Sequence, residues 1–245
     1  MNRCGKEIPV NERLDKILAS QNIGSRKEVG ILIRKGAVTV NGQAVKKADM
    51  KADPEKDVIC VNGRQVKYSR FVYIMMNKPA GVLSATNDRH AQTVVDLVPE
   101  EMQRRGLFPA GRLDKDTTGL LIITDDGDFS HRMLAPASHV FKLYEAELDS
   151  PVVPEDIERF AQGLDLGDFN ALPAELFLPD ETVPTVARVR VREGKFHQVK
   201  RMFSACGQEV TALRRLSIGA LQLDGTLAPG ECKLLTEDEV LAVFD

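Results

Sequence analysis

Residues 111–132 read GRLDKDTTGLLIITDDGDFSHR, and this stretch holds the most informative pattern in the chain. A glycine, a basic residue and an acid lead into a Thr-Thr-Gly turn, and the apolar run LLIIT follows at 120–124. A tight turn before an apolar strand leaves its polar side chains at the strand edge. The pattern therefore predicts a buried strand with Asp114 on the preceding loop, where a carboxylate is either an ordinary exposed acid or part of a site.

Three further segments have the pattern of strands, and helical patterns separate them. They are FVYIMMN at 71–77, LYEAEL at 143–148 and VARVRV at 186–191. Short strands mixed with helices predict an α+β domain with a large, mostly antiparallel mixed sheet flanked by helices. DDGD at 125–128 is typical of a turn between a strand and a helix. Thr236 and Glu239 have the spacing of a capping box for a last helix that runs to Phe244.

The N-terminal part predicts two short helices in an αα-hairpin. The first is expected between Glu12 and Asn22, with Gly24 ending it. The second begins with the capping-box pattern of Ser25 and Glu28. Apolar residues at helical spacing form the buried stripes of both helices; they are Leu14, Ile17, Leu18, Val29, Leu32 and Ile33.

A hairpin and a connector complete this module. Val38 and Val40 alternate with polar residues up to Asn41-Gly42, the preferred two-residue hairpin turn. The segment CVNGRQVKYSR at 60–70 is interpreted as a polar connector. We therefore expect a small module with its connector at 1–66 and a second domain, with the large sheet, at 67–245.

The two parts of the chain carry opposite charge. Residues 1–67 hold 14 Lys and Arg against 8 Asp and Glu, whereas residues 68–245 hold 19 against 28. A small basic module on a larger acidic body fits a polyanion-binding appendage, although an ordinary solvated surface has the same composition. The candidate contacts lie on the second predicted helix, where Lys27 and Arg34 share a face; they are Arg26, Lys27, Arg34 and Lys35.

The sequence has no feature of a membrane or disulfide-bonded protein. Its longest apolar stretches fall short of the roughly 20 residues that cross a bilayer, and the start, MNRCGKEIPV, lacks the apolar core of a signal peptide. We expect a cytoplasmic protein. The cysteines are scattered without a CxxC pair, so neither a disulfide framework nor a zinc site is expected; they are Cys4, Cys60, Cys206 and Cys232.

GRLDKDTTGLL at 111–121 resembles the catalytic motif of the RsuA branch of pseudouridine synthases. KPAG at 78–81 resembles the turn that opens the family's catalytic domain, FKLYEAEL places Tyr144 where the family has its active-site tyrosine, and EGKFHQVKRMF at 193–203 resembles its late basic motif. Residues 12–45 resemble a small RNA-binding module that a small-subunit ribosomal protein shares with some tRNA synthetases. The likeness extends from about Glu12 to the final helix.

The resemblance implies an RNA-modifying enzyme that isomerises a uridine of ribosomal RNA to pseudouridine. This reaction breaks a carbon–nitrogen glycosidic bond and joins the same sugar to carbon 5 of the uracil. Because nothing is oxidised or hydrolysed, no metal and no redox cofactor are expected. The chemistry needs an ionised carboxylate as nucleophile or base at the sugar, and a general base that relocates a proton. We expect a monomer.

The resemblance also assigns roles to residues. Asp114 would be the carboxylate, Lys200 the cation that keeps it ionised, and Tyr144 the ring beneath the flipped uracil. Arg112 would enter the RNA helix as the target nucleotide leaves it. His197 and Arg201 share a side of the same predicted helix as Lys200 and would contact RNA, whereas Val199, Phe203 and Cys206 would face inward.

The tetrapeptide RLDK occurs twice, at 13–16 and at 112–115, and only the second copy fits a catalytic loop. Asp15 lies among helical residues, so it is expected on a helix surface. Asp114 lies between Gly111 and Gly119. Asp116 is expected to cap the turn through its side chain.

Alternatives remain open from the sequence. The chain could be a non-catalytic RNA-binding assembly factor, although retention of Asp114, Tyr144 and Lys200 together argues against that. A metal-dependent phosphoesterase could use the acids of DDGD at 125–128. Within the family, DKDTTG, HQVKRMF and APGECKLLTEDE resemble the RsuA subgroup and favour small-subunit RNA over large-subunit RNA as substrate.

Overall fold

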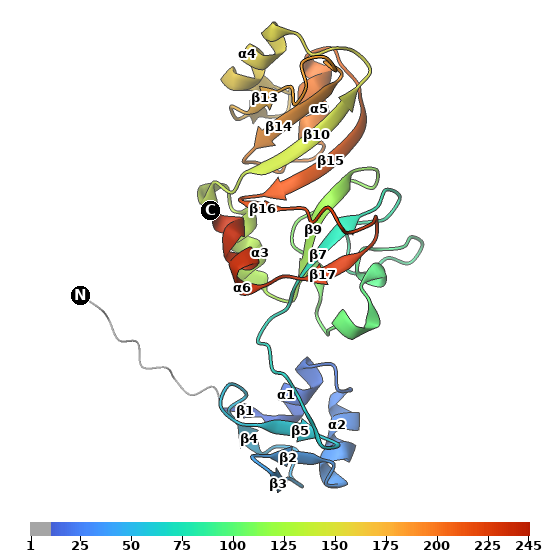
Figure 1. The fold of residues 1–245 in the computed structure, drawn as a ribbon, viewed down its shortest axis with the longest axis vertical. Helices are drawn as coiled ribbons and strands as arrows, with labels where there is room; N and C mark the ends of the chain where they lie inside the picture. The colour runs from blue at the N-terminus through green and yellow to red at the C-terminus, as the bar shows by residue number, and fades with distance from the viewer. Residues whose placement is uncertain (1–10) are drawn as a thin grey trace, which may run out of the picture. The chain divides into compact units, whose positions relative to one another are not determined.

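The computed structural model describes residues 11–245, which form two compact units (Figure 1). Of the described residues, the first unit comprises 11–70 together with Gln103–Arg105, and the second comprises Phe71–Met102 and Gly106–Asp245. The expectations on Cys4 and on MNRCGKEIPV fall outside the described residues. Within residues 11–245, no helix is long and apolar enough to cross a bilayer.

Two helices and a small sheet share one core in the first unit. A four-stranded sheet has the order β3-β2-β5-β6, and β1 pairs with β4. The apolar stripes of both helices pack with the buried strand residues. The elements are β1 (Glu12–Arg13), α1 (Leu14–Ser20), α2 (Arg26–Arg34), β2 (Val38–Val40), β3 (Gln43–Ala44), β4 (Lys51–Ala52), β5 (Ile59–Val61) and β6 (Arg64–Gln65).

Two local predictions for this unit are confirmed. The Ser25 side chain accepts from the Glu28 amide while the Glu28 carboxylate accepts from the Ser25 amide, so the capping box of α2 is complete. Asn41 and Gly42 have φ angles of 50° and 79°, as a two-residue turn with both central residues left-handed requires.

Three other predictions for this unit need correction. Helix α1 ends at Ser20, ahead of the stop expected at Gly24, and Asn22 beyond its end has a left-handed φ of 58°. The predicted connector is wrong in its first half, because residues 59–65 form a second hairpin around Asn62-Gly63. Asp15 is buried, and its carboxylate accepts hydrogen bonds from Arg13 and Arg26. These two guanidinium groups lower the pKa of Asp15.

The second unit is built around one large sheet with the order β13-β14-β10-β15-β9-β7-β17. Its strands are β7 (Tyr73–Lys78), β8 (Phe108–Pro109), β9 (Thr118–Thr124), β10 (Lys142–Leu148), β13 (Glu175–Phe177), β14 (Val186–Val191), β15 (Val210–Ile218), β16 (Leu221–Gln222) and β17 (Cys232–Leu234), with the separate hairpin β11 (Leu164–Asp165) and β12 (Asn170–Ala171). Its helices are α3 (Gly127–Leu134), α4 (Pro154–Gln162), α5 (Gln198–Ala205) and α6 (Glu237–Leu241), with the 3-10 turns η1 (Val95–Leu97), η2 (Glu100–Met102), η3 (Pro136–Ser138) and η4 (Ala242–Phe244).

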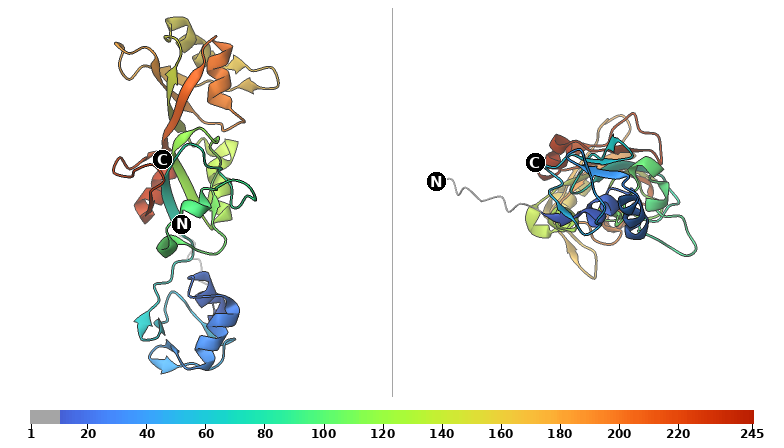
Figure 2. Two further views of the ribbon diagram at one scale, coloured as in Figure 1. Left: turned by 90° about the vertical axis from the view of Figure 1, so that its right-hand side faces the viewer. Right: turned by 90° about the horizontal axis from the view of Figure 1, so that it is seen from below.

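The burial of each strand reflects how many faces of the sheet are covered. Strands β7 and β9 are buried almost continuously, because one core cluster lies on each of their faces. In β10 and β14 buried residues alternate with more exposed ones, so only one face is packed. Figure 1 shows β10, β14 and β15 with α4 and α5 at one end of this unit, and β7, β9 and β17 with α3 and α6 at the other. In a view turned by 90°, α5 lies beside the strands of its end (Figure 2).

The two ends of the sheet meet at a short parallel pairing. Thr118 and Gly119 of β9 pair with Arg214 and Arg215 of β15, and the other strand pairings of this sheet within residues 11–245 are antiparallel. Gly119 has φ +97°, and a Cβ there would lie 2.3 Å from the Arg215 carbonyl oxygen. Only glycine allows β15 to approach so closely. The loop that contains Asp114 ends at this junction.

The predicted α+β class and mixed sheet are confirmed. Asp126 of DDGD caps α3 by accepting from the Phe129 amide, and Thr236 with Glu239 forms a complete capping box on α6. The last helix is shorter than expected: α6 ends at Leu241, and a 3-10 turn continues to Phe244.

We expect Gly119→Ala to reduce the free energy of unfolding of the second unit by about 3 kcal/mol or more, because it adds a backbone clash to an unfavourable φ. Gly81→Ala is the matched control, since Gly81 also has positive φ (+87°) but a Cβ there would meet no atom within 4 Å. Gly81→Ala should reduce the free energy of unfolding by about 1 kcal/mol. Urea denaturation followed by circular dichroism measures both, and equal losses would contradict the importance of the close approach.

Candidate active site

The loop before β9 is fastened by its backbone to residues 78–84. The Lys78 ammonium donates to the carbonyl oxygens of Lys115 (3.3 Å) and Thr117 (3.0 Å), and the Gly81 amide donates to the Lys115 carbonyl (2.7 Å). The Ser84 hydroxyl donates to the Leu113 carbonyl and accepts from the Leu113 amide. The backbone on both sides of Asp114 is therefore held in place.

Lys78 is an unusual anchor because its side chain is fully buried. Its third acceptor is the Pro79 carbonyl, at 3.0 Å. Burial lowers the pKa of Lys78 to about 8, against the opposing attraction of Asp116 and Asp114. The ammonium form supplies three hydrogens to three carbonyl oxygens, so its hydrogen bonds depend on that charge.

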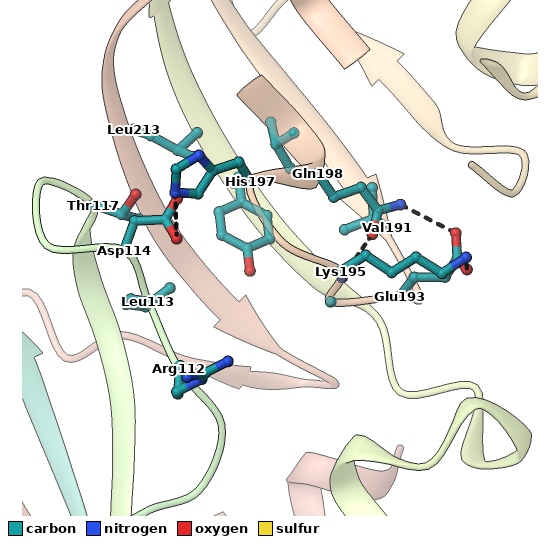
Figure 3. A pocket seen from close by; sticks show the side chains of 13 residues that line it. Arg112, Leu113, Asp114, Thr117, Val191, Glu193, Lys195, His197, Gln198 and Leu213 are labelled. Atoms are coloured by element: carbon teal, nitrogen blue, oxygen red, sulfur yellow. Dashed lines mark hydrogen bonds and ion pairs between the residues drawn. The ribbon is translucent and has the colours of Figure 1, made fainter. Parts of the chain in front are cut away.

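Two basic side chains of the segment around α5 face the Asp114 carboxylate. His197 Nε2 lies 3.5 Å from one oxygen and Lys200 Nζ 3.7 Å from the other. Figure 3 shows Asp114 and His197 pointing toward each other from different segments of the chain, with Arg112 farther along the Asp114 loop. The Asp114 side chain is 27% exposed, so it lies at an open mouth rather than in the core.

Lys200 is shared between two acids. Its Nζ donates to both oxygens of Asp116, at 2.6 and 2.7 Å, and these hydrogen bonds lower the pKa of Asp116. The expected turn-capping role of Asp116 is therefore corrected: this carboxylate is bound to Lys200 and is otherwise exposed. Lys200 does lie beside Asp114, as predicted, but its shorter contacts are with Asp116.

The turn before α5 presents His197 to Asp114. His197 precedes the helix with a left-handed φ of 51°. The buried Gln198 side chain accepts from the Lys195 amide and donates to Glu193, which pins the two ends of this turn (Figure 3). Val199, Met202 and Phe203 hold α5 against the core. The inward positions of Val199 and Phe203 are confirmed, whereas Cys206 is only half-buried and Met202 was missed.

These groups line a cleft of about 50 Å³, which Leu113, Thr117, Val191 and Leu213 also border. Tyr144 of β10 lies in its wall and is buried. The buried Arg215 guanidinium lies behind this tyrosine, donating to the Leu120 carbonyl (2.7 Å) and to the Tyr144 hydroxyl (3.4 Å). The cleft is therefore lined by the Asp114 carboxylate and by the Tyr144 ring, whose hydroxyl accepts a hydrogen bond from the buried Arg215.

The structure brings only some of the predicted residues together. Arg112, Asp114, Tyr144 and His197 line the cleft, and Lys200 lies beside it. Arg201 points elsewhere: it binds Asp168 and the Leu166 carbonyl, and stacks over Phe169.

The remaining predicted contacts belong to the first unit, where all four are exposed. Arg26 also binds Asp15. The four residues are Arg26, Lys27, Arg34 and Lys35.

Sequence reasoning missed Ser84 and Arg215 and gave no role to Lys78. No short pattern marks Ser84, whereas Lys78 is the first residue of the KPAG match and Arg215 lies in an alternating strand segment.

The acids of DDGD do not form a separate site. Asp126 caps α3 and accepts from the Tyr73 hydroxyl, and Asp125 accepts from the Val72 amide. Among the described residues, no group of three or more His, Cys, Asp and Glu is arranged to hold a metal ion. The chemistry available in the cleft is that of a carboxylate that attacks an electrophilic carbon or takes a proton.

Comparisons with known proteins agree with this geometry. The family model described as RNA pseudouridylate synthase matches residues 72–205, and the S4 domain model matches residues 12–59. The chain is 47% identical to the uncharacterized RNA pseudouridine synthase YtzG of Bacillus subtilis, over 93% of this chain and 96% of the relative. It is 42% identical to the ribosomal small subunit pseudouridine synthase A of Escherichia coli, over 94% and 99%.

A solved structure agrees as well. A crystal structure of a pseudouridylate synthase superposes with a TM-score of 0.66 at 34% identity and covers 95% of this chain and 99% of its own. With a family model that spans more than half of the chain and relatives that span nearly all of it, this protein belongs to the RNA pseudouridine synthase family, with an S4 domain at its N-terminal end.

Proposed function

We propose that this protein converts a uridine of small-subunit ribosomal RNA to pseudouridine, with Asp114 as the catalytic carboxylate. The observation that carries the proposal is the setting of Asp114: its loop is fixed by backbone hydrogen bonds, and its carboxylate faces His197 and Lys200 across a cleft that Tyr144 lines. The choice of small-subunit RNA rests on relatives that carry that name and span almost the same length.

The proposed reaction uses the carboxylate at the sugar. In one route Asp114 attacks C1′ as the bond from C1′ to uracil N1 breaks, and the resulting ester bond breaks when C5 attacks C1′. In the other route Asp114 removes the C2′ proton as the bond from C1′ to N1 breaks, and returns it to C2′ once C5 is joined to C1′. The uracil turns within the cleft, C5 forms the new bond to C1′, and the C5 proton passes to a base and then to solvent while N1 gains a proton. Atoms and charge balance, as an isomerisation requires. His197 and Lys200 face the carboxylate across the cleft, and Tyr144 packs against the uracil ring.

Two groups of basic residues serve RNA binding in this proposal. Arg112 is exposed at the cleft, two residues from Asp114, and takes the place of the target nucleotide in the RNA helix. Lys27 and Arg34 lie exposed on α2 of the S4 domain and contact phosphates. Arg201 is left out of the RNA contacts, because its guanidinium is bound to Asp168 and the Leu166 carbonyl.

Mapping of pseudouridines in ribosomal RNA tests the function directly. Cells that lack this protein should lose one pseudouridine in the small-subunit RNA, and expression of the wild-type chain should restore it. The purified protein should convert the same uridine in a transcript or in a partly assembled subunit. An unchanged small-subunit map, or loss of a large-subunit site alone, would contradict the proposed substrate.

Replacing Lys27 and Arg34 together by Gln should weaken RNA binding and reduce its salt dependence by up to about two phosphate contacts. The change should not affect single-turnover conversion at saturating RNA, because these residues lie in the S4 domain. Lys46 and Lys47, also exposed in this unit, provide a control with the same loss of charge. If the control variant loses as much affinity as the α2 variant, binding reflects net charge and not the α2 face.

Conversion should fall as pH rises through about 8, because burial lowers the pKa of Lys78 to that value and its neutral amine cannot donate to all three carbonyl oxygens. Lys78→Met should slow single-turnover conversion on the order of 100-fold, since displacement of the Asp114 loop spoils alignment. The variant should also lose the alkaline decline.

Lys142 provides the control, because burial lowers its pKa to about 8 as well, yet its ammonium donates to the Val140 and Arg192 carbonyls. A Lys142→Met enzyme should retain the decline above pH 8. If Lys142→Met removes the decline and Lys78→Met does not, the loss of conversion above pH 8 reflects titration of Lys142 and not of Lys78.

A further inference from the structure

Phe196 is exposed to an extent that folding alone does not explain. Its side chain is 73% exposed, more than any other large apolar residue within residues 11–245. It lies between Lys195 and His197, both of which line the cleft. An aromatic ring held in solvent between two cleft-lining residues contributes little to the core and is available to stack on a ligand.

The backbone and a neighbouring ring hold Phe196 in this position. The rings of Phe196 and His197 stack with a centroid distance of 3.8 Å and an interplanar angle of 19°. His197 in turn reaches to 3.5 Å from Asp114. The left-handed φ of His197 is rare for a residue with a side chain, and such conformations cluster at functional sites. One face of Phe196 is therefore covered by His197, and the other is open to solvent.

Cationic side chains lie along the cleft that His197 borders. Arg112 and Lys195 line this cleft, and Lys195 also lies 3.5 Å from Glu193. Lys200, one turn into α5, is bound to Asp116. An exposed aromatic face next to cationic side chains is the combination that binds unpaired nucleobases, since the ring stacks on the base while the cations attract the backbone. A protein partner would instead call for a wider apolar surface.

We propose that Phe196, backed by His197, is a stacking site for an unpaired base adjacent to the target uridine. The target must reach Asp114 inside the cleft, so the base on the outer face of Phe196 belongs to a neighbouring nucleotide. The site would hold the strand while the target is out of the stack, and it would favour single-stranded or looped RNA. This inference deepens the proposed function and rests on it.

The experiment uses the full-length chain and the shortest small-subunit transcript whose uridine the wild-type protein converts. Binding is measured for this RNA and for versions with one abasic nucleotide at each position flanking the target. Phe196→Ala should weaken binding of the intact RNA by about 5- to 150-fold, the range for loss of one stacked base. On the RNA that lacks the stacked base, wild type and Phe196→Ala should bind equally. Phe196→Trp should retain affinity.

Phe177→Ala is the matched control, since Phe177 is also an exposed phenylalanine but lies on strand β13; it should bind every RNA as the wild type does. Wild-type affinity of Phe196→Ala for the intact RNA would overturn the stacking site. An equal loss on all abasic RNAs would overturn it as well, because the ring would then act without a base partner. Absence of conversion by the wild-type protein would instead contradict the proposed function itself.

Discussion

The catalytic domain depends on the place where β9 and β15 run parallel for two residue pairs. There Gly119 lies against the backbone of Arg215, closer than any residue with a Cβ permits. This contact joins a half of the sheet that is buried on both faces to a half that is packed on one face. The Asp114 loop ends at the same junction, and the buried Arg215 side chain reaches Tyr144 from it. The close approach of Gly119 to Arg215 therefore helps to position both the Asp114 loop and Tyr144, which lie on two sides of the cleft.

Charged side chains hold the Asp114 loop and surround its carboxylate. The buried ammonium of Lys78 donates hydrogen bonds to three carbonyl oxygens, and two of these belong to the Asp114 loop. Burying a charge costs stability, and these hydrogen bonds offset that cost. They also fix the backbone on one side of Asp114. On the open side, His197 and Lys200 approach the Asp114 carboxylate from α5. Lys200 binds Asp116 more closely, so its charge is divided between two acids. The backbone around Asp114 is therefore fixed by hydrogen bonds, and its carboxylate faces two basic side chains on the open side.

Local rules predicted the parts of the fold that local interactions decide. The Ser25–Glu28 capping box, the Asn41-Gly42 turn and the continuous burial of LLIIT follow from neighbouring residues alone. The same rule would have found the second hairpin at Asn62-Gly63, which we interpreted as a connector. Other features depend on distant segments: Asp15 is buried because Arg13 and Arg26 converge on it, and Arg201 turns away because Asp168 lies within reach. The burial of Lys78 and Arg215 depends on tertiary contacts that no short pattern in their own strands encodes.

The central claim is that the Asp114 carboxylate performs the chemical step. Release of tritium from carbon 5 of labelled uridine, measured with enzyme in excess over RNA, tests it most directly. Asp114→Asn should fold and bind RNA but release no tritium. Asp116→Asn, two residues along the same loop and largely exposed, should still release it. Release by Asp114→Asn at the wild-type rate would contradict the account, whatever the family resemblance.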